Sequence, residues 1–134
     1  MSVYDKLKEL NITLPSLTAP AAVFVPFVIT GNQIFTSGHI ARKDGKSWVG
    51  KLGSTVTTEQ GKEAARGIAI ELLSTLHAAT GDLNKIKRIV KLLVLVKGSP
   101  GKFGSGKYCR RFFATGSKRL GQMTFGVFPS QPMN

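Results

Sequence analysis

Two apolar runs separated by two turn residues stand out in the first third of the chain. The runs Val23–Thr30 and Gln33–Ala41 are rich in β-branched and aromatic residues and flank the pair Gly31 and Asn32. Such residues tolerate the positive φ of a two-residue turn, so the pattern predicts an antiparallel hairpin. The second run contains Ser37 and Gly38, and a glycine within a strand marks a bend or a close approach. We therefore interpret the hairpin as a folding element and as one wall of a site.

A helical repeat of apolar positions follows between residues 57 and 80. Thr57 and Gln60 fit a capping box, in which each side chain binds an amide at the start of the helix. Gly61 and Gly67 weaken the helix slightly, although a small side chain can let a helix lie close to a sheet. The predicted buried stripe recurs every three or four residues, and it consists of Ala65, Ile68, Ala69, Leu72, Leu76 and Ala79.

Three further segments complete the predicted core. A short amphipathic helix is expected over Asp5–Asn11, a short strand over Ser47–Leu52 and a longer strand over Lys87–Val96. The last strand is apolar on both faces, which is typical of a strand at the centre of a sheet or at an interface. The order predicts an α+β fold with one long helix packed on one face of a sheet. Because the other face then needs cover, we expect the chain to form oligomers.

Charge divides the chain into two zones. The formal net charge is +12. Residues 1–96 hold 12 basic and 7 acidic side chains, whereas residues 97–134 hold 7 basic side chains and no acidic one. The second zone also contains 7 glycines and 3 prolines. Only Cys109–Phe113 and Gln122–Phe128 are expected to be ordered within it. We therefore interpret 1–96 as the α+β core and 97–134 as a basic, glycine-rich segment that is not a separate domain.

Composition also excludes several classes of protein. No apolar run is long enough to span a membrane, and the first residues lack the apolar stretch of a secretory signal. A single cysteine, Cys109, cannot form an internal disulfide and suits a reducing, cytoplasmic setting. With one cysteine and two distant histidines, the sequence has no metal-site spacing. We therefore expect neither a metal nor a cofactor.

Several motifs resemble, in order, those of the RidA family of enamine/imine deaminases, also called the YjgF or endoribonuclease L-PSP family. The stretch GNQIFTSGHIA at residues 31–41 resembles the family's GN-x-x-F-x-SGQ pattern. The helix Thr57–Leu76 and the run Leu76–Leu92 resemble its helix and the link into the next strand. The resemblance covers residues 3–96. It implies a chorismate mutase-like fold, usually a homotrimer with clefts between subunits.

The resemblance also implies a reaction and a set of site residues. Family members hydrolyse reactive 2-imino or 2-enamino acids to 2-keto acids and ammonia. Ser37 and Gly38 would line the substrate pocket, and Phe24 falls where the family commonly has an aromatic residue. A late arginine binds the substrate carboxylate in the family, and a late glutamate with backbone groups holds the water. Here the arginine position reads Gln122, the nearest arginine is Arg119, and no acidic residue follows Asp82.

Two interpretations of these residues stay open. The Ser37–Gly38 segment is either a site wall or a bulge that shapes the sheet. His39 replaces the family's common glutamine, as a substrate-binding residue with acid–base chemistry or as a polar residue with satisfied hydrogen bonds. His77 is expected to be structural or exposed.

The break near Lys97 also raises the hypothesis of a shifted reading frame or alternative splicing, which transcript sequencing across codons 90–134 would test.

An alternative function is a non-catalytic trimer that binds RNA through the basic segment. Basic residues there alternate with aromatic ones, and this combination can pair with phosphates and stack on bases. The residues concerned are Tyr108, Arg110, Arg111, Phe112, Phe113, Lys118 and Arg119. A solvated basic segment explains the same pattern. Cys109 beside two arginines could be a reactive thiolate, although no histidine lies near it in sequence.

Overall fold

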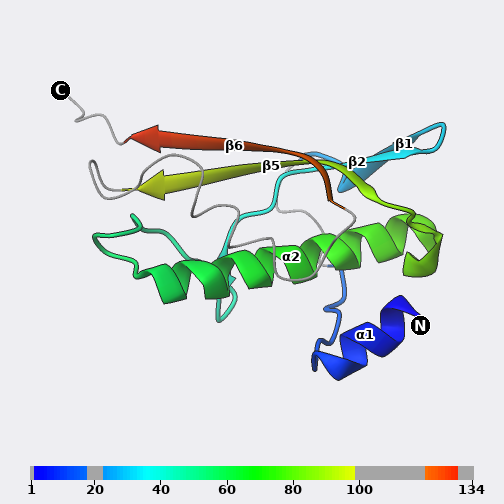
Figure 1. The fold of residues 1–134 in the computed structure, drawn as a ribbon, viewed down its shortest axis with the longest axis horizontal. Coiled ribbons are helices and arrows are strands. Elements are labelled where there is room, and N and C mark those ends of the chain that lie inside the picture. The colour runs from blue at the N-terminus through cyan, green and yellow to red at the C-terminus, as the bar shows by residue number, and fades with distance from the viewer. Residues whose placement is uncertain (1, 18–22, 99–119, 130–134) are drawn as a thin grey trace. The chain divides into compact units, whose positions relative to one another are not determined.

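The computed structural model describes residues 2–17, 23–98 and 120–129 (Figure 1). Its contacts divide the chain into two compact units, and each is described by itself. The first consists of 1–40 and 67–87, and the second of 41–66 and 88–134. The elements are helices and short sheets, which confirms the predicted α+β class. No helix among the described residues is both long and apolar enough to cross a membrane.

The first unit begins with helix α1, Val3–Glu9. Ser2 caps it, because its hydroxyl accepts a hydrogen bond from the Tyr4 amide at 3.1 Å while its own amide donates to the Asp5 carboxylate at 3.1 Å. The helix was predicted over Asp5–Asn11, and its true bounds lie two residues earlier because this capping box starts it.

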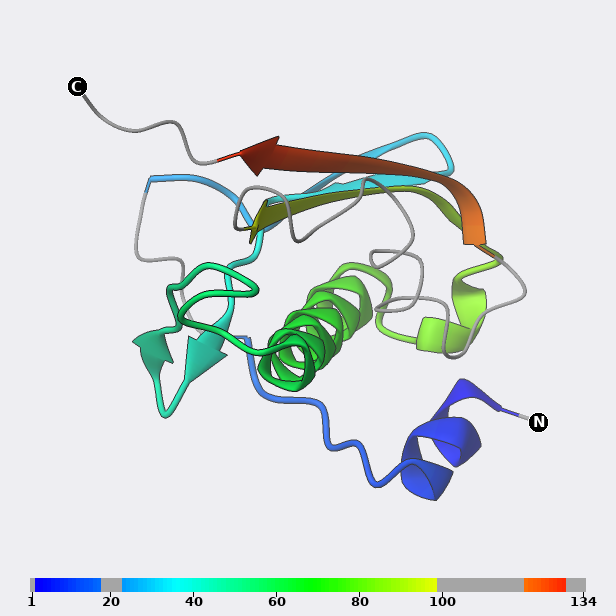
Figure 2. The ribbon, with the colours of Figure 1, turned by 60° about the vertical axis from the view of Figure 1, so that its left-hand side comes forward.

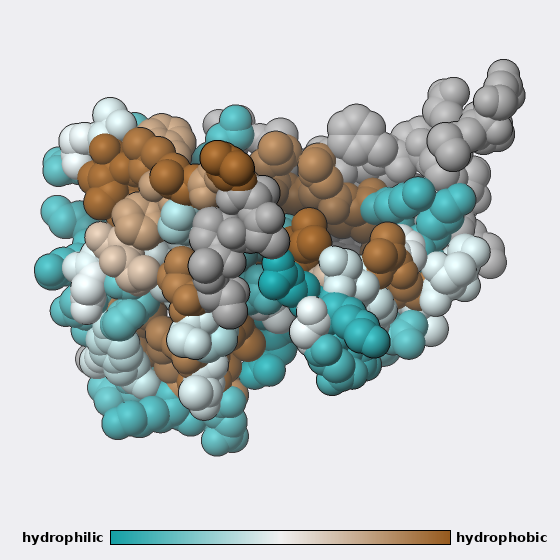
Figure 3. All heavy atoms as spheres, turned by 180° about the vertical axis from the view of Figure 1, so that it is seen from behind, coloured by the Kyte–Doolittle hydropathy of each residue, from teal (hydrophilic) through white to brown (hydrophobic). Residues whose placement is uncertain are grey.

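Strands β1, Phe27–Thr30, and β2, Gln33–Thr36, form the predicted antiparallel hairpin. Thr30 pairs with Gln33 across the turn, and Gly31 takes a φ of 54°, whereas Asn32 does not take a positive φ. The strands are shorter than predicted. Several of their apolar side chains are exposed, and brown spheres gather over the hairpin in Figure 3.

Helix α2, Thr58–Thr80, contributes to both units and confirms the long helix. Its capping box forms as predicted, because the Thr57 amide donates to the Gln60 side chain at 2.9 Å and the Gln60 amide donates to the Thr57 hydroxyl at 3.2 Å. The predicted stripe is only half-buried along its length. The buried residues of the helix are Ser74 and Thr75, so the prediction of a fully buried apolar stripe was wrong for the single chain.

The 3-10 helix η1, Leu83–Lys85, holds α1 in place. Leu83 is 2% exposed, and its amide donates to the Tyr4 hydroxyl at 3.0 Å. The Val3 amide donates to the Asn84 side chain at 3.0 Å. The Tyr4 ring also meets the edge of His77 at a centroid distance of 6.1 Å, which supports the structural interpretation of that histidine.

The second unit contains the small hairpin of β3, Arg42–Lys43, and β4, Lys46–Ser47. The strand predicted over Ser47–Leu52 was wrong. The Trp48 amide donates to the Ala41 carbonyl at 2.8 Å and extends the hairpin by one bond, and between Val49 and Leu52 only Leu52 makes isolated bridges. The Lys43 ammonium lies 4.6 Å from the centroid of the Trp48 ring and 3.5 Å from the Glu63 carboxylate.

Strands β5, Ile89–Gly98, and β6, Leu120–Pro129, form a parallel pair and lie side by side in Figures 1 and 2. β5 ends two residues later than predicted, because Leu52 bridges to Gly98 and binds the Lys97 carbonyl. Along β5 half-buried and exposed positions alternate from residue 92, so one of its two apolar faces is exposed in the single chain, and a place at an interface stays a prediction. The range of β6 includes Gln122–Phe128, and the order of residues 97–134 stays a prediction. Cys109–Phe113 lies outside the described residues.

Candidate functional site

The site predicted at the end of the hairpin is built on Ser37, which follows β2 directly. Its amide donates to the Pro26 carbonyl at 2.9 Å and so extends the pairing of the hairpin by one bond. Its hydroxyl donates to the Val25 carbonyl. Backbone and side chain together therefore tie the end of β2 to the segment that precedes β1, and a residue bound at two points is well fixed.

Gly38 is exposed, and the fold itself does not require a glycine there. Apart from the neighbouring residues Ser37 and His39, no heavy atom of the described residues lies within 4 Å of a Cβ built on Gly38, and its φ lies outside the left-handed region. Among the described residues, no hydrogen bond reaches its amide. The close approach that a glycine in this position predicts is therefore not made by the residues that the structure describes. These residues leave the space beside the Gly38 backbone open.

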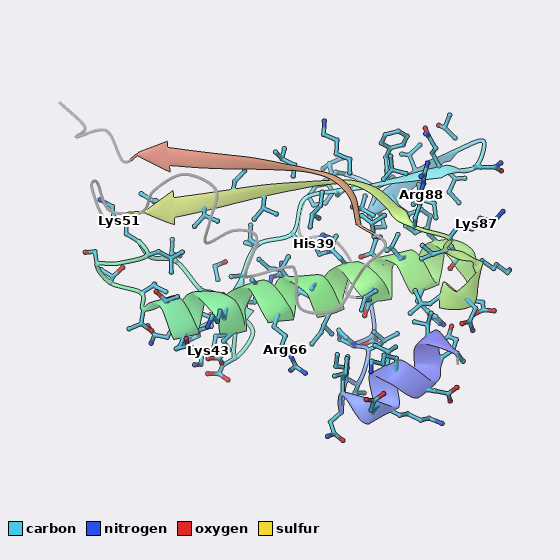
Figure 4. The ribbon with its side chains drawn as sticks, in the orientation of Figure 1. His39, Lys43, Lys51, Arg66, Lys87 and Arg88 are labelled. Carbon is cyan, nitrogen blue, oxygen red and sulfur yellow. The ribbon has the colours of Figure 1, made fainter. Side chains whose placement is uncertain are left out.

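His39 joins the hairpin end to helix α2 (Figure 4). Its Nδ1 lies 3.1 Å from the Ser37 carbonyl oxygen and its Nε2 lies 3.1 Å from the Thr75 hydroxyl. Both ring nitrogens are thus engaged within the chain, which favours the interpretation of a satisfied polar residue over a free acid or base. Proton transfer by the ring would require one of these two hydrogen bonds to break. The prediction of general acid–base work at His39 stays untested.

Thr75 is the residue that sequence reasoning missed. It is 2% exposed, and its hydroxyl lies 3.2 Å from the Glu71 carbonyl one turn earlier in α2. A signal was present, because Thr75 lies three residues after Leu72 and so shares the predicted buried stripe. A polar side chain at such a position needs a partner.

The other predicted site residues are placed less completely. Phe24 is 50% exposed and precedes Val25, whose carbonyl accepts the Ser37 hydroxyl. Arg119, the candidate for carboxylate binding, lies outside the described residues. The structure therefore brings Ser37, Gly38 and His39 together, places Phe24 close to them in the chain, and leaves Arg119 a prediction. Among 2–17, 23–98 and 120–129, no group of three or more metal-ligating side chains was found.

Comparisons with known proteins match most of the chain. A family model described as "YjgF/chorismate mutase-like, putative endoribonuclease" matches residues 5–99. Protein TCP17 of Trypanosoma cruzi is 42% identical over 99 residues, which cover 73% of this chain and 62% of TCP17. The chain therefore spans less than two thirds of the length of that relative.

Two solved structures share the fold. One, from Shewanella oneidensis and described as a "putative endoribonuclease", has a TM-score of 0.76 at 23% identity and covers 98% of this chain and 91% of its own. The other, from Agrobacterium tumefaciens and of unknown function, has a TM-score of 0.74 at 33% identity and covers 97% and 84%. The first similarity supports the fold alone.

Proposed function

This chain belongs to the YjgF/chorismate mutase-like family, and on that basis we propose that it hydrolyses reactive 2-imino or 2-enamino acids to 2-keto acids and ammonia. One observation carries the proposal beyond family membership. Gly38 is exposed, and none of the described residues beyond its two neighbours has an atom within 4 Å of a Cβ position there, while Ser37 and His39 on either side are hydrogen-bonded within the chain. A fixed backbone beside open space is the kind of wall that a small substrate requires.

The hydrolysis requires few catalytic groups from the protein. Water adds to the carbon of the C=N bond and one of its protons passes to the nitrogen, which gives a carbinolamine. The hydroxyl proton then passes to the nitrogen as the C–N bond breaks, which releases ammonia and leaves a 2-keto acid. A protonated imine is already electrophilic, so orientation and binding of the carboxylate contribute most. Backbone amides serve this purpose because they donate hydrogen bonds without titrating.

The remaining site roles follow the family pattern. Phe24 would pack against the apolar part of the substrate, and Arg119 would bind the carboxylate through two parallel hydrogen bonds. The family's late glutamate has no counterpart, because no acidic residue follows Asp82. We therefore expect this chain to be slower than a family member with the complete set.

We also propose a homotrimer in the cytoplasm. On β5, Leu93 is 60% exposed and Leu95 is 63% exposed; on the hairpin, Phe35 is 61% exposed. Exposed apolar side chains in such number favour self-association, since a copy of the chain would remove them from water. The single cysteine supports a reducing compartment.

The decisive experiment is an assay on 2-iminobutanoate made in place by an amino acid oxidase. Semicarbazide traps the imine, so an active deaminase lowers semicarbazone formation and accelerates release of ammonia. The expected result is an acceleration that is proportional to protein concentration and saturates with imine. Protein of confirmed fold and assembly that gives no acceleration with several 2-imino acids would contradict the proposal.

A second candidate function is RNA binding. The residues 97–134, with seven basic and no acidic side chains, favour it. In that case the affinity for a single-stranded oligonucleotide falls steeply with salt, and deletion of 97–134 abolishes it. Binding that is independent of salt would exclude this function.

A further inference from the structure

We propose that His39 and Thr75 form a positioning pair that holds the Ser37–Gly38 peptide in one orientation and thereby presents the Gly38 amide N–H to an oxygen of a bound carboxylate. The identity of the carboxylate, a 2-imino acid or its 2-keto product, rests on the proposed function. The geometry of the pair does not, because every contact in it lies within the first unit of the chain.

His39 holds the peptide group between Ser37 and Gly38 in one orientation. The Ser37 carbonyl and the Gly38 amide belong to one planar peptide group, and in a trans peptide they point in opposite directions. No cis peptide bond occurs among the described residues. The contact of 3.1 Å between His39 Nδ1 and the Ser37 carbonyl oxygen therefore also fixes the direction of the Gly38 N–H. That N–H points away from the carbonyl side and has no partner among the described residues.

The two partners of the His39 ring determine which of its nitrogens carries the proton. A carbonyl oxygen only accepts hydrogen bonds, so His39 Nδ1 must carry a proton for its contact with Ser37 to be favourable. In the neutral ring Nε2 then has a lone pair and must accept. The donor is the Thr75 hydroxyl, 3.1 Å away. The pair therefore selects the Nδ1–H tautomer, which is defined by its two partners rather than by the ring itself.

Burial limits the hydrogen-bond partners of the Thr75 hydroxyl. At 2% exposure its hydroxyl cannot turn to water, so its choices are the His39 ring and the Glu71 carbonyl at 3.2 Å. The carbonyl of Glu71 belongs to the middle of α2 and keeps its helical amide partner when the hydroxyl turns to His39. The helix thus provides a rigid anchor for the ring, and the ring provides one for the exposed peptide at the hairpin end.

The tautomer can be measured without any assay. In the full chain labelled with 15N, long-range proton–nitrogen spectra in alkaline buffer distinguish Nδ1–H from Nε2–H, and a His77→Gln variant assigns the two histidines. We expect His39 as the Nδ1–H tautomer. The Nε2–H tautomer would overturn the proposal, whatever the outcome of the deaminase assay.

The presentation of Gly38 is tested with 2-oxobutanoate, a 2-keto acid, as the ligand. We expect the Gly38 amide signal to shift on titration of the wild type. Thr75→Val keeps the shape of the side chain but removes its hydroxyl, and we expect it to bind about tenfold more weakly. Thr75→Ser should restore binding. The matched control is Ser74→Ala, because Ser74 is the adjacent buried hydroxyl and bonds only to the Ile70 carbonyl, at 3.3 Å.

The outcomes separate the two proposals. Equal binding by Thr75→Val and Ser74→Ala, or a Gly38 signal that does not move in the wild type, would overturn the positioning pair. If the wild type deaminates 2-iminobutanoate, we expect Thr75→Val to raise KM by about tenfold with little change in kcat, because the carboxylate is bound alike in substrate and product. If it does not, the deaminase proposal fails, while the tautomer and the titration still decide this one. His39→Gln should retain more binding than His39→Ala, since an amide can both donate and accept.

Discussion

Gly61 on helix α2 lies against the side chain of Leu52, and the two residues leave no room for a methyl group between them. A Cβ on Gly61 would lie 2.5 Å from Leu52 Cδ2. Leu52 is 7% exposed, and its amide donates to the Lys97 carbonyl at 3.0 Å, so it links the start of α2 to the end of β5. The glycine that weakens the helix locally thus permits close packing of α2 against Leu52.

Opposite effects are expected when the two glycines of α2 are replaced by alanine. Gly67→Ala should raise the free energy of unfolding by about 0.5–1 kcal/mol, because the position is open and alanine favours helix. Gly61→Ala gains the same helical preference but overpacks Leu52 at a cost of about 1–3 kcal/mol, so we expect a net loss of roughly 1 kcal/mol. Urea denaturation of both variants measures the contrast. Equal stabilisation by both would contradict the packing.

Local sequence signals predicted much of this fold. The turn at Gly31 and the capping box of Thr57 and Gln60 depend on neighbouring residues only, so the hairpin and the long helix could be predicted with their order. The suggestion that Gly61 allows a close approach to the helix is explained by its contact with Leu52. Leu52 was wrongly assigned to a strand. Its bridge to Gly98 joins residues far apart in the chain, and local sequence signals do not reveal such a contact.

The site was predictable only in part, and for the same reason. Ser37 and Gly38 carry a motif within three residues, whereas the partner of His39 lies 36 residues away on α2. Periodicity marks Thr75 as a position on the buried stripe but does not say what its hydroxyl binds. The stripe itself is half-buried in one chain, because apolar spacing predicts a face that seeks cover and does not specify what covers it.

Asp82 should make stability depend on pH. The Asn84 amide donates to its carboxylate at 2.9 Å and lowers the pKa of Asp82; a hydrogen bond from Tyr4 and the charge of Lys85 act in the same direction, and desolvation, which raises it, is outweighed. A lowered folded-state pKa contributes stability above the unfolded value of about 3.9, and this contribution is lost as the pH falls through the lower folded value.

The measurement is the difference in unfolding free energy between the wild type and Asp82→Asn as a function of pH. We expect the wild type to be the more stable protein at neutral pH and the difference to shrink in the acidic range below about pH 4. Asn84 also binds Val3, so Asp82 rather than Asn84 is the position to change. A difference that is constant from neutral to acidic pH would show that the carboxylate charge does not contribute.

Leu95→Glu should weaken self-association. Leu95 is 63% exposed near the middle of β5, so a charge there costs the single chain little but would be buried in an assembly that covers this face. Sedimentation velocity should show a shift toward the monomer, with unchanged circular dichroism. Thr13→Glu introduces the same charge at an exposed position outside the helices and strands and serves as the control. An unchanged oligomer in Leu95→Glu would mean that the assembly leaves this face of β5 uncovered.

Gly38→Ala should separate stability from function most sharply. A methyl group at this position meets no atom within 4 Å in the part of the chain that the structure describes, its two neighbours aside, and the φ of Gly38 lies outside the left-handed region, so we expect the folded chain to accept alanine without strain. Alanine also restricts the unfolded chain, and we expect the variant to be more stable by about 0.4–1 kcal/mol. If a substrate occupies the open space, the same methyl group lies against it, and we expect deaminase activity to fall by about tenfold or more.

The two readouts are therefore expected to move in opposite directions. Thermal unfolding of Gly38→Ala should give a midpoint equal to or above that of the wild type, while kcat/KM for 2-iminobutanoate falls. Gly67→Ala is the matched control, because it makes the same substitution at another open position and should raise stability without loss of activity. Apart from its neighbours Ser37 and His39, no described residue lies within 4 Å of the methyl group, so a loss of activity would report on the substrate. A Gly38→Ala variant with full activity would show that the substrate does not approach the hairpin end.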